Sequence, residues 1–174
     1  IELLLRRHPD ERQQYYLENM KGSSDHILSL VNDLLDFQRL ESGEMEVHSV
    51  PFRVPVLFDE IYTSFQPIAE AKGLRFVLNL KPEETGQVYM GDPIRIRQVV
   101  GNLLSNAIKF TEAGRVVLLV SLQKLSAVHY QLSITVSDSG PGIPKEEQER
   151  IFGEFTRLAD TEEVEGFGLG LSIT

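Results

Sequence analysis

The stretch Asn102-Leu-Leu-Ser-Asn106-Ala-Ile-Lys109-Phe110-Thr111 carries two amides and one ammonium, spaced four and then three residues apart. On an α-helix these spacings place the three polar side chains on one face. Asp92-Pro93 supplies an N-cap and an N1 proline, so we expect a helix from there to Phe110. Amide oxygens suit a hydrated Mg²⁺ and an ammonium suits a phosphate, although an isolated trio of this kind is more often a solvated polar face.

The segments around this helix alternate between strand and helix patterns. Three apolar runs are typical of strands, and the last two of them predict an antiparallel hairpin: 74–80, 116–122 and 130–136. Pro55 can open a helix that reaches about Lys72, in which Pro67 predicts a kink or an early stop. A short helix is expected over 145–150. The mixture predicts an α+β fold, a two-layer sandwich with helices packed on one face of the sheet.

The first quarter of the chain reads as a helical hairpin. Asp10 can cap a helix with Gln13 reaching back, and no stop follows before Ser42-Gly43, which gives a helix about 45 Å long. Residues 1–7 look like the end of an earlier helix, joined by a turn at His8-Pro9. The long helix has an apolar stripe that is wide for one partner, which favours a homodimeric four-helix bundle. We therefore divide the chain into residues 1–43 and residues 44–174.

Composition excludes several classes of partner. With 17 lysines and arginines against 26 aspartates and glutamates, the 174-residue chain has a net charge of −9, which argues against nucleic acid and against anionic membranes as partners. No apolar run approaches the roughly 20 residues of a membrane helix, so we expect no membrane contact by these residues. The chain has no cysteine, which rules out thiolate chemistry and fits a reducing compartment.

A second polar signal is Asp138-Ser-Gly140-Pro-Gly142-Ile143-Pro144, in which a carboxylate ends a strand and two glycines follow. Glycines let the backbone approach a ligand closely. A carboxylate in this place can accept a hydrogen bond from the exocyclic amine of adenine, which guanine lacks there. On its own, the segment is also typical of an ordinary turn.

A third signal is Gly166-Phe-Gly168-Leu169-Gly170-Leu171-Ser172, with glycines at alternate positions before an apolar segment. Backbone amides at such a helix start can bind phosphate oxygens. The motif is neither a P-loop nor a dinucleotide fingerprint, because the residues and spacing of both are absent. Taken alone, it could equally be a flexible hinge.

In this order, and with Glu149-Arg-Ile-Phe152-Gly-Glu-Phe155 between the last two, these signals resemble the N, G1, F and G2 boxes of sensor histidine kinases. The resemblance extends through Asp92-Pro-Ile-Arg95 and back to the helix around His26 and Glu41-Ser-Gly43. It implies a Bergerat-type ATP-binding fold joined to a dimerisation hairpin. It also implies transfer of the ATP γ-phosphate to a histidine, for relay to an aspartate of a response regulator receiver domain, separate or fused. We expect these residues to lie in the cytoplasm, whether or not the parent protein is membrane-anchored.

The resemblance also implies roles for individual residues. Asn106 matches the Mg²⁺ ligand, assisted by Asn102, and Lys109 matches the phosphate-contacting lysine. Asp138 matches the carboxylate that reads adenine. The residues expected to shape the rest of the ATP site, with Arg157 as a lid contact to phosphate, are Phe110, Gly140, Gly142, Ile143, Phe155, Arg157, Gly166, Gly168, Leu169, Gly170 and Leu171.

The sequence departs from the family pattern in its histidines. None of the four, at positions 8, 26, 48 and 129, is followed by an acidic residue on a first bundle helix, so we expect the phosphate acceptor upstream of Ile1. The stretch 156–165 is short for a lid, and the final strands of the fold are expected beyond Thr174. We expect Asn102 to stand where ATP-hydrolysing relatives of the fold use a glutamate as general base, which disfavours hydrolysis by water. The alternative is a regulatory module that lacks kinase activity.

Overall fold

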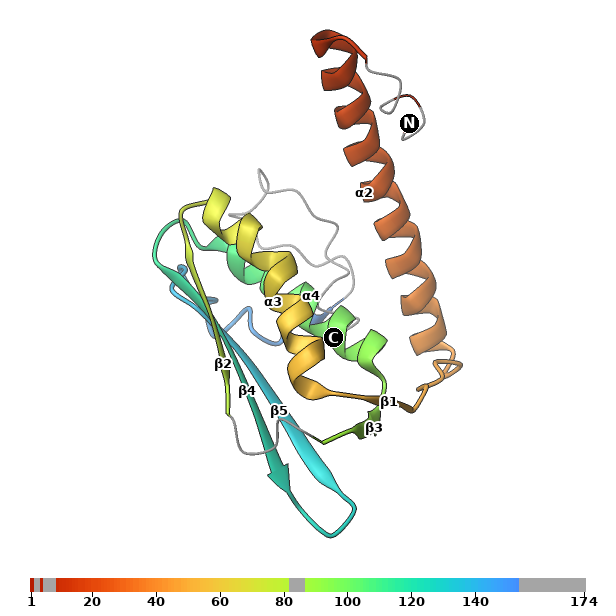
Figure 1. Cartoon of the computed structure of the whole chain (residues 1–174), viewed down its shortest axis with the longest axis vertical. Coiled ribbons are helices and arrows are strands. Elements are labelled where there is room, and N and C mark those ends of the chain that lie inside the picture. The colour runs from red at the N-terminus through yellow and green to blue at the C-terminus, as the bar shows by residue number, and fades with distance from the viewer. Residues whose placement is uncertain (2–3, 5–8, 82–86, 154–174) are drawn as a thin grey trace.

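The computed structural model describes residues 1, 4, 9–81 and 87–153, which form one long helix and a layered α/β part (Figure 1). The long helix, α2 (Glu11–Glu41), begins at Asp10, whose Oδ1 accepts a hydrogen bond from the Gln13 N–H at 2.8 Å. The Asp10 N–H donates to Gln13 Oε1 at 3.2 Å, so the expected capping box is formed. The helix ends at Ser42, and Gly43 follows with a φ of 71°. The predicted extent of this helix is confirmed.

Large apolar side chains of α2 are exposed. They are Tyr15, Tyr16, Met20, Ile27, Leu28, Val31, Leu34, Leu35 and Leu40. Such a stripe is the face that a helical partner would cover. Of the expected first helix of the hairpin, residues 1–7, only Ile1 and Leu4 belong to the described part of the chain.

The layered part contains a three-stranded sheet in the order β2-β4-β5. Strand β2 (Arg75–Leu80) pairs in parallel with β4 (Arg115–Lys124), and β4 pairs antiparallel with β5 (Tyr130–Asp138). The predicted hairpin is thereby confirmed. Residues 130–137 alternate between half-buried and exposed, as a strand with one solvated face requires.

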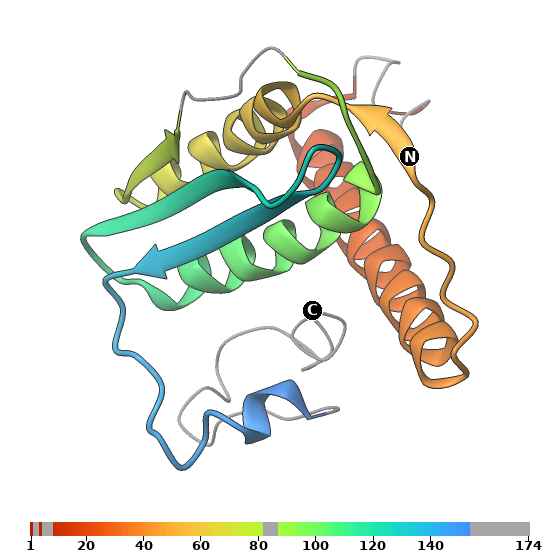
Figure 2. The same ribbon diagram turned by 90° about the horizontal axis from the view of Figure 1, so that it is seen from below.

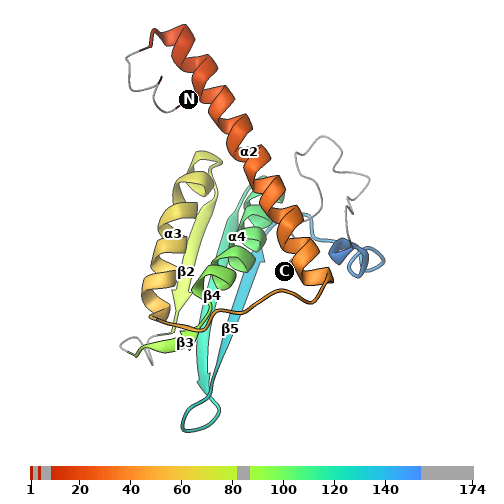
Figure 3. The same ribbon diagram turned by 90° about the vertical axis from the view of Figure 1, so that its right-hand side faces the viewer.

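Helices α3 (Val54–Ala71) and α4 (Pro93–Phe110) cover one face of this sheet (Figure 1, Figure 2). The core between helices and sheet consists of Val54, Leu57, Phe58, Ile61, Ala69, Leu74, Phe76, Val100, Leu104, Ala107, Ile108, Val116, Leu118 and Val120. The predicted two-layer α+β architecture is confirmed. Helix α2 lies on the far side of the helical layer from the sheet (Figure 1, Figure 3).

The structure corrects two local predictions. Of the kink or early stop predicted at Pro67, the early stop is wrong, because helix α3 runs through this residue. The carbonyl four residues earlier, on exposed Thr63, loses its backbone donor but can be solvated by water. Residues 145–149 form turns rather than a helix, followed by the 3-10 helix η2 (Arg150–Phe152). The Glu147 N–H donates to the Pro144 carbonyl at 2.9 Å, a bond that spans three residues, because so short a segment does not sustain α-helical propagation.

A second, two-stranded sheet was not predicted. It pairs β1 (Val50–Phe52) antiparallel with β3 (Tyr89–Gly91). The pair joins the segment that follows α2 to the segment that precedes α4 (Figure 1). It therefore sets where α4 starts relative to the end of α2.

Candidate functional site

Helix α4 places the predicted amides and ammonium on the face opposite the sheet. Its buried residues are Val100, Leu104, Ala107 and Ile108. At 3.6 residues per turn, Asn102, Asn106 and Lys109 fall within an arc of about 60° on the other side. All three are half-buried, and the Asn106 side chain makes no hydrogen bond within the described residues. The amide of Asn106 is therefore available to a ligand.

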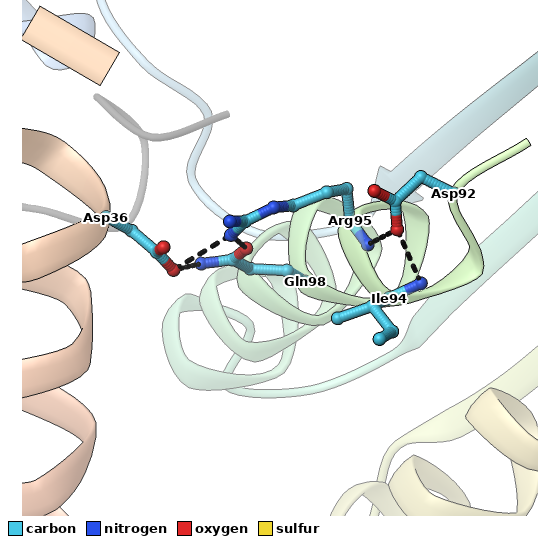
Figure 4. A network of polar contacts seen from close by, with 5 residues as sticks. All are labelled: Asp36, Asp92, Ile94, Arg95 and Gln98. Atoms are coloured by element: carbon cyan, nitrogen blue, oxygen red, sulfur yellow. Dashed lines mark hydrogen bonds and ion pairs between the residues drawn. The ribbon is translucent and has the colours of Figure 1, made fainter. Parts of the chain in front are cut away.

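The N-terminus of α4 is fixed by Asp92. Its Oδ1 accepts hydrogen bonds from the N–H groups of Ile94 at 3.1 Å and Arg95 at 3.0 Å (Figure 4). Its Oδ2 accepts one from the His48 N–H at 2.9 Å, which ties the segment after α2 to this helix. The backbone hydrogen bonds from Arg95 and then His48 outweigh burial and lower the pKa of Asp92 below its ordinary value near 3.8. Asp92 is thus an ionised cap that joins two segments.

The C-terminus of α4 is fixed by Lys72, which the sequence did not single out. Its Nζ donates to the carbonyl oxygens of Ile108 at 2.8 Å and Lys109 at 2.6 Å. A cation at this end of a helix satisfies carbonyls that have no partner within the helix and complements the helix dipole. No local sequence signal reveals this contact, because the two partners are 36 and 37 residues away.

The turn after β5 lies against the end of α4. Asp138 ends β5, and its Oδ1 accepts a hydrogen bond from the Gly140 N–H at 2.9 Å. A Cβ placed on Gly140 would lie 3.1 Å from the Phe110 carbonyl oxygen and 3.3 Å from Thr111 Oγ1. The close approach that glycine permits therefore brings the Asp138 turn to the end of the helix that carries Asn106.

Asp138 is exposed, and its Oδ2 has no hydrogen-bond partner among the residues that the structure describes. Gly142, with a φ of 74°, adopts a backbone conformation that favours glycine. Beyond it, Ile143 is exposed, and Phe110 is exposed beneath the Lys109 Nζ, which lies 5.1 Å from the ring centroid. Asp138, Ile143 and Phe110 are therefore all accessible to a ligand.

A further residue that sequence reasoning missed is Ser139. Its Oγ donates to the Ala113 carbonyl at 3.1 Å and accepts from the Arg115 N–H at 2.9 Å. These bonds hold the Asp138 turn against the start of β4. The only sequence signal was the turn composition itself.

The remaining site predictions fall outside the described residues. They concern Phe155, Arg157, Gly166, Gly168, Leu169, Gly170 and Leu171. Within the described part, no group of three or more histidines, cysteines, aspartates and glutamates is arranged to hold a metal ion. No helix in that part is long and apolar enough to cross a membrane.

The chain is similar to known proteins over nearly its whole length. Residues 1–43 match the family model of the His Kinase A (phospho-acceptor) domain, and residues 91–174 match that of the histidine kinase-, DNA gyrase B- and HSP90-like ATPase. The signal transduction histidine-protein kinase BarA of Escherichia coli is 39% identical over 165 residues, which is 93% of this chain and 18% of BarA.

Two solved structures give the same result. Full-length ShkA in complex with AMPPNP superposes with a TM-score of 0.75 at 34% identity, covering 93% of this chain and 32% of that one. The catalytic domain of histidine kinase ThkA superposes with a TM-score of 0.54 at 30% identity, covering 74% of this chain and 78% of that domain.

The α+β layer is thus an ATPase domain of the Bergerat type, and it follows a helical part of the phosphoacceptor type. The chain belongs to the two-component sensor histidine kinases and contains their kinase core. It spans 18% of the length of BarA and of the sensor protein GacS of Pseudomonas syringae.

Proposed function

We propose that the chain binds Mg-ATP at the edge formed by α4 and the Asp138 turn and transfers the γ-phosphate to a histidine outside residues 1–174. In that reaction a histidine nitrogen forms a bond to the γ-phosphorus, and the bond to the bridging oxygen breaks, which releases ADP. The observation that supports the proposal is the close approach of Gly140 to the Phe110 carbonyl, because it brings Asp138 to the end of the helix that carries Asn106 and Lys109.

The adenine end of the site is assigned to Asp138. Its Oδ2 would accept a hydrogen bond from the exocyclic amine, while Oδ1 stays bonded to the Gly140 N–H. Phe110, Gly142 and Ile143 would border the base. Guanine presents a carbonyl in that place, and two acceptors facing each other repel, so the site should select adenine.

The phosphate end of the site is assigned to Lys109 and Asn106, with Asn102 one turn earlier. Asn106 would supply one neutral oxygen ligand to Mg²⁺, and the other ligands would come from water and the nucleotide. This fits the described residues, because the half-buried Asn106 side chain makes no hydrogen bond among them. When bound, Mg²⁺ neutralises charge on the phosphates. Lys109 would add a cation there, and its carbonyl is held by Lys72.

The assembly is assigned from the helical part. We infer that α2 and the helix before it pair with a second copy, since the apolar stripe of α2 is exposed in a single chain. A response regulator receiver domain, separate or fused, would take the phosphate from the histidine. Because ATP is the donor, we place these residues in the cytoplasm.

Calorimetric titration tests the nucleotide site. ADP and a non-hydrolysable ATP analogue would be titrated with and without Mg²⁺, and GTP serves as the control. We expect adenine-selective binding that Mg²⁺ strengthens. A folded protein that binds neither nucleotide would refute the proposal and favour a regulatory module without kinase activity.

A further inference from the structure

One polar cluster joins α2 to α4. Asp36 Oδ2 accepts a hydrogen bond from Gln98 Nε2 at 2.8 Å and lies 3.0 Å from Arg95 Nη1 (Figure 4). Arg95 Nη1 also donates to Gln98 Oε1 at 2.7 Å. The side chains of Arg95 and Asp36 are only 28% and 17% exposed, so water competes weakly for them. The three side chains form a closed network between two elements far apart in the sequence.

The network lies on the same face of α4 as Asn102, Asn106 and Lys109, the residues proposed to bind Mg-ATP. We call this face the nucleotide stripe. At 100° per residue, Arg95, Gln98, Asn102, Asn106 and Lys109 all fall within an arc of about 80°. Arg95 and Asn106 are about 17 Å apart along the helix axis at 1.5 Å per residue. The contact holds the N-terminal end of this face against α2. The C-terminal end of the same face therefore also points to the side of the helical layer on which α2 lies.

The side-chain contacts recorded between Asp36 and α4 are polar. Among the apolar neighbours of Asp36 on α2, Leu34, Leu35 and Leu40 are exposed and Phe37 is half-buried. Burial raises the pKa of Asp36. Hydrogen bonds from Gln98 and Arg95, together with the charges of Arg95 and Arg39, lower it by more, so the net pKa lies below its ordinary value. Hydrogen bonds and ion pairs depend on direction, so this contact fixes the orientation of α4 relative to α2 without a large packed interface.

We propose that Asp36, Arg95 and Gln98 are positioning residues that aim the nucleotide stripe of α4 at the helical part for phosphoryl transfer. The inference rests on the proposed function. No contact with ATP is assigned to Asp36, Arg95 or Gln98, because these three side chains bond to one another. Its basis is that a reaction between two bound groups depends steeply on their alignment.

The test uses Asp36→Asn and the exchange Asp36→Arg with Arg95→Asp, in a chain that includes the upstream acceptor helix. Arg97→Gln is the matched control, since it removes the Arg97 ion pair with Glu60 inside the α/β layer but leaves the cluster intact. We expect Asp36→Asn to lower the phosphorylation rate at saturating ATP about tenfold. The affinity for the ATP analogue should stay within about twofold, and KM should not rise. The exchange should restore part of the rate.

A second measurement reports the contact without catalysis. The chain has no cysteine, so spin labels attached through Ser24→Cys and Thr135→Cys report the distance between α2 and the sheet. Both native side chains are exposed. Asp36→Asn should broaden this distance distribution, whereas Arg97→Gln should leave it unchanged.

Each alternative result has a separate meaning. A distance distribution that Asp36→Asn does not alter would overturn the contact, even if the unmodified chain bound no ATP and the proposed function failed. A rate that is unchanged or higher in Asp36→Asn, with ATP binding intact in the unmodified chain, would overturn the positioning role alone. An affinity that falls in parallel with the rate would also overturn it, since the residue would then act through the nucleotide site.

Discussion

Replacing Asp92 with asparagine separates the two contacts that its carboxylate makes. Asparagine keeps an oxygen that can cap α4 through the N–H groups of Ile94 and Arg95. In that orientation its amide NH₂ faces the N–H of His48, where the native Oδ2 accepts a bond of 2.9 Å. Two donors then oppose each other at a buried position, so the segment after α2 loses its attachment to α4.

The loss of stability in Asp92→Asn follows from the lost hydrogen bond with the His48 N–H. A hydrogen bond to a charged group contributes about 1.5–3 kcal/mol, so we expect Asp92→Asn to lower the free energy of unfolding by about 2 kcal/mol. Asp92→Ala also removes the cap, which adds about 1 kcal/mol. For a chain of this size, about 2 kcal/mol corresponds to a fall in Tm of about 4–8 °C.

The assay is urea unfolding followed by circular dichroism between pH 7 and pH 2.5. Because the pKa of Asp92 is lowered in the folded state, its stabilisation is complete above the ordinary value near 3.8 and is lost as the pH falls through the folded pKa. The stability difference between the native chain and Asp92→Asn should therefore be full at pH 7 and shrink in acid. Equal stability at pH 7, or a difference that persists in acid, would refute the reasoning.

Four other substitutions probe the site and the core. Asp138→Asn should weaken ADP binding about 10- to 100-fold, because the amide cannot accept on both sides, and calorimetry with unchanged affinity would disprove the adenine assignment. Asn106→Ala should abolish the effect of Mg²⁺ on affinity for the ATP analogue, and a retained effect would place the metal elsewhere. Gly140→Ala should weaken nucleotide binding, since its Cβ would meet Asp138 Oδ1 at 2.9 Å, and an unchanged titration would contradict this. Leu104→Ala, in the fully buried core, should lower the free energy of unfolding by about 3 kcal/mol in urea, and a loss under about 1 kcal/mol would mean that the core closes around the gap.

Signals confined to a few neighbouring residues predicted the fold well. The capping pair of Asp10 and Gln13, the Asp92-Pro93 start and the alternation along β5 each determine a local structure by steric and hydrogen-bonding rules. Strands β1 and β3 were missed because three residues are too few to show a period. Over residues 145–149 the composition favoured a helix, but the segment is too short to sustain one.

The candidate site divides in the same way. The sharing of one helix face by Asn102, Asn106 and Lys109 follows from spacing alone, whereas the packing of Gly140 on the end of α4 depends on how the whole sheet is assembled. Gln98 and Asp36 are 62 residues apart, and neither belongs to a motif that requires the other. Contacts of this kind are set by tertiary packing, so no reading of periodicity could have identified them.

The anchoring of α4 at both ends makes this helix a lever arm. Asp92 holds its first turn and Lys72 holds its last carbonyls, so a rotation of the layer about the Asp36 contact cannot be absorbed by fraying at either end. With Asn106 about 17 Å from that pivot, a rotation of about 10° would displace it by about 3 Å. Misplacement by about 1 Å can already cost a hundredfold in rate, so a tilt of a few degrees between α2 and α4 would suffice to switch the proposed phosphoryl transfer on or off.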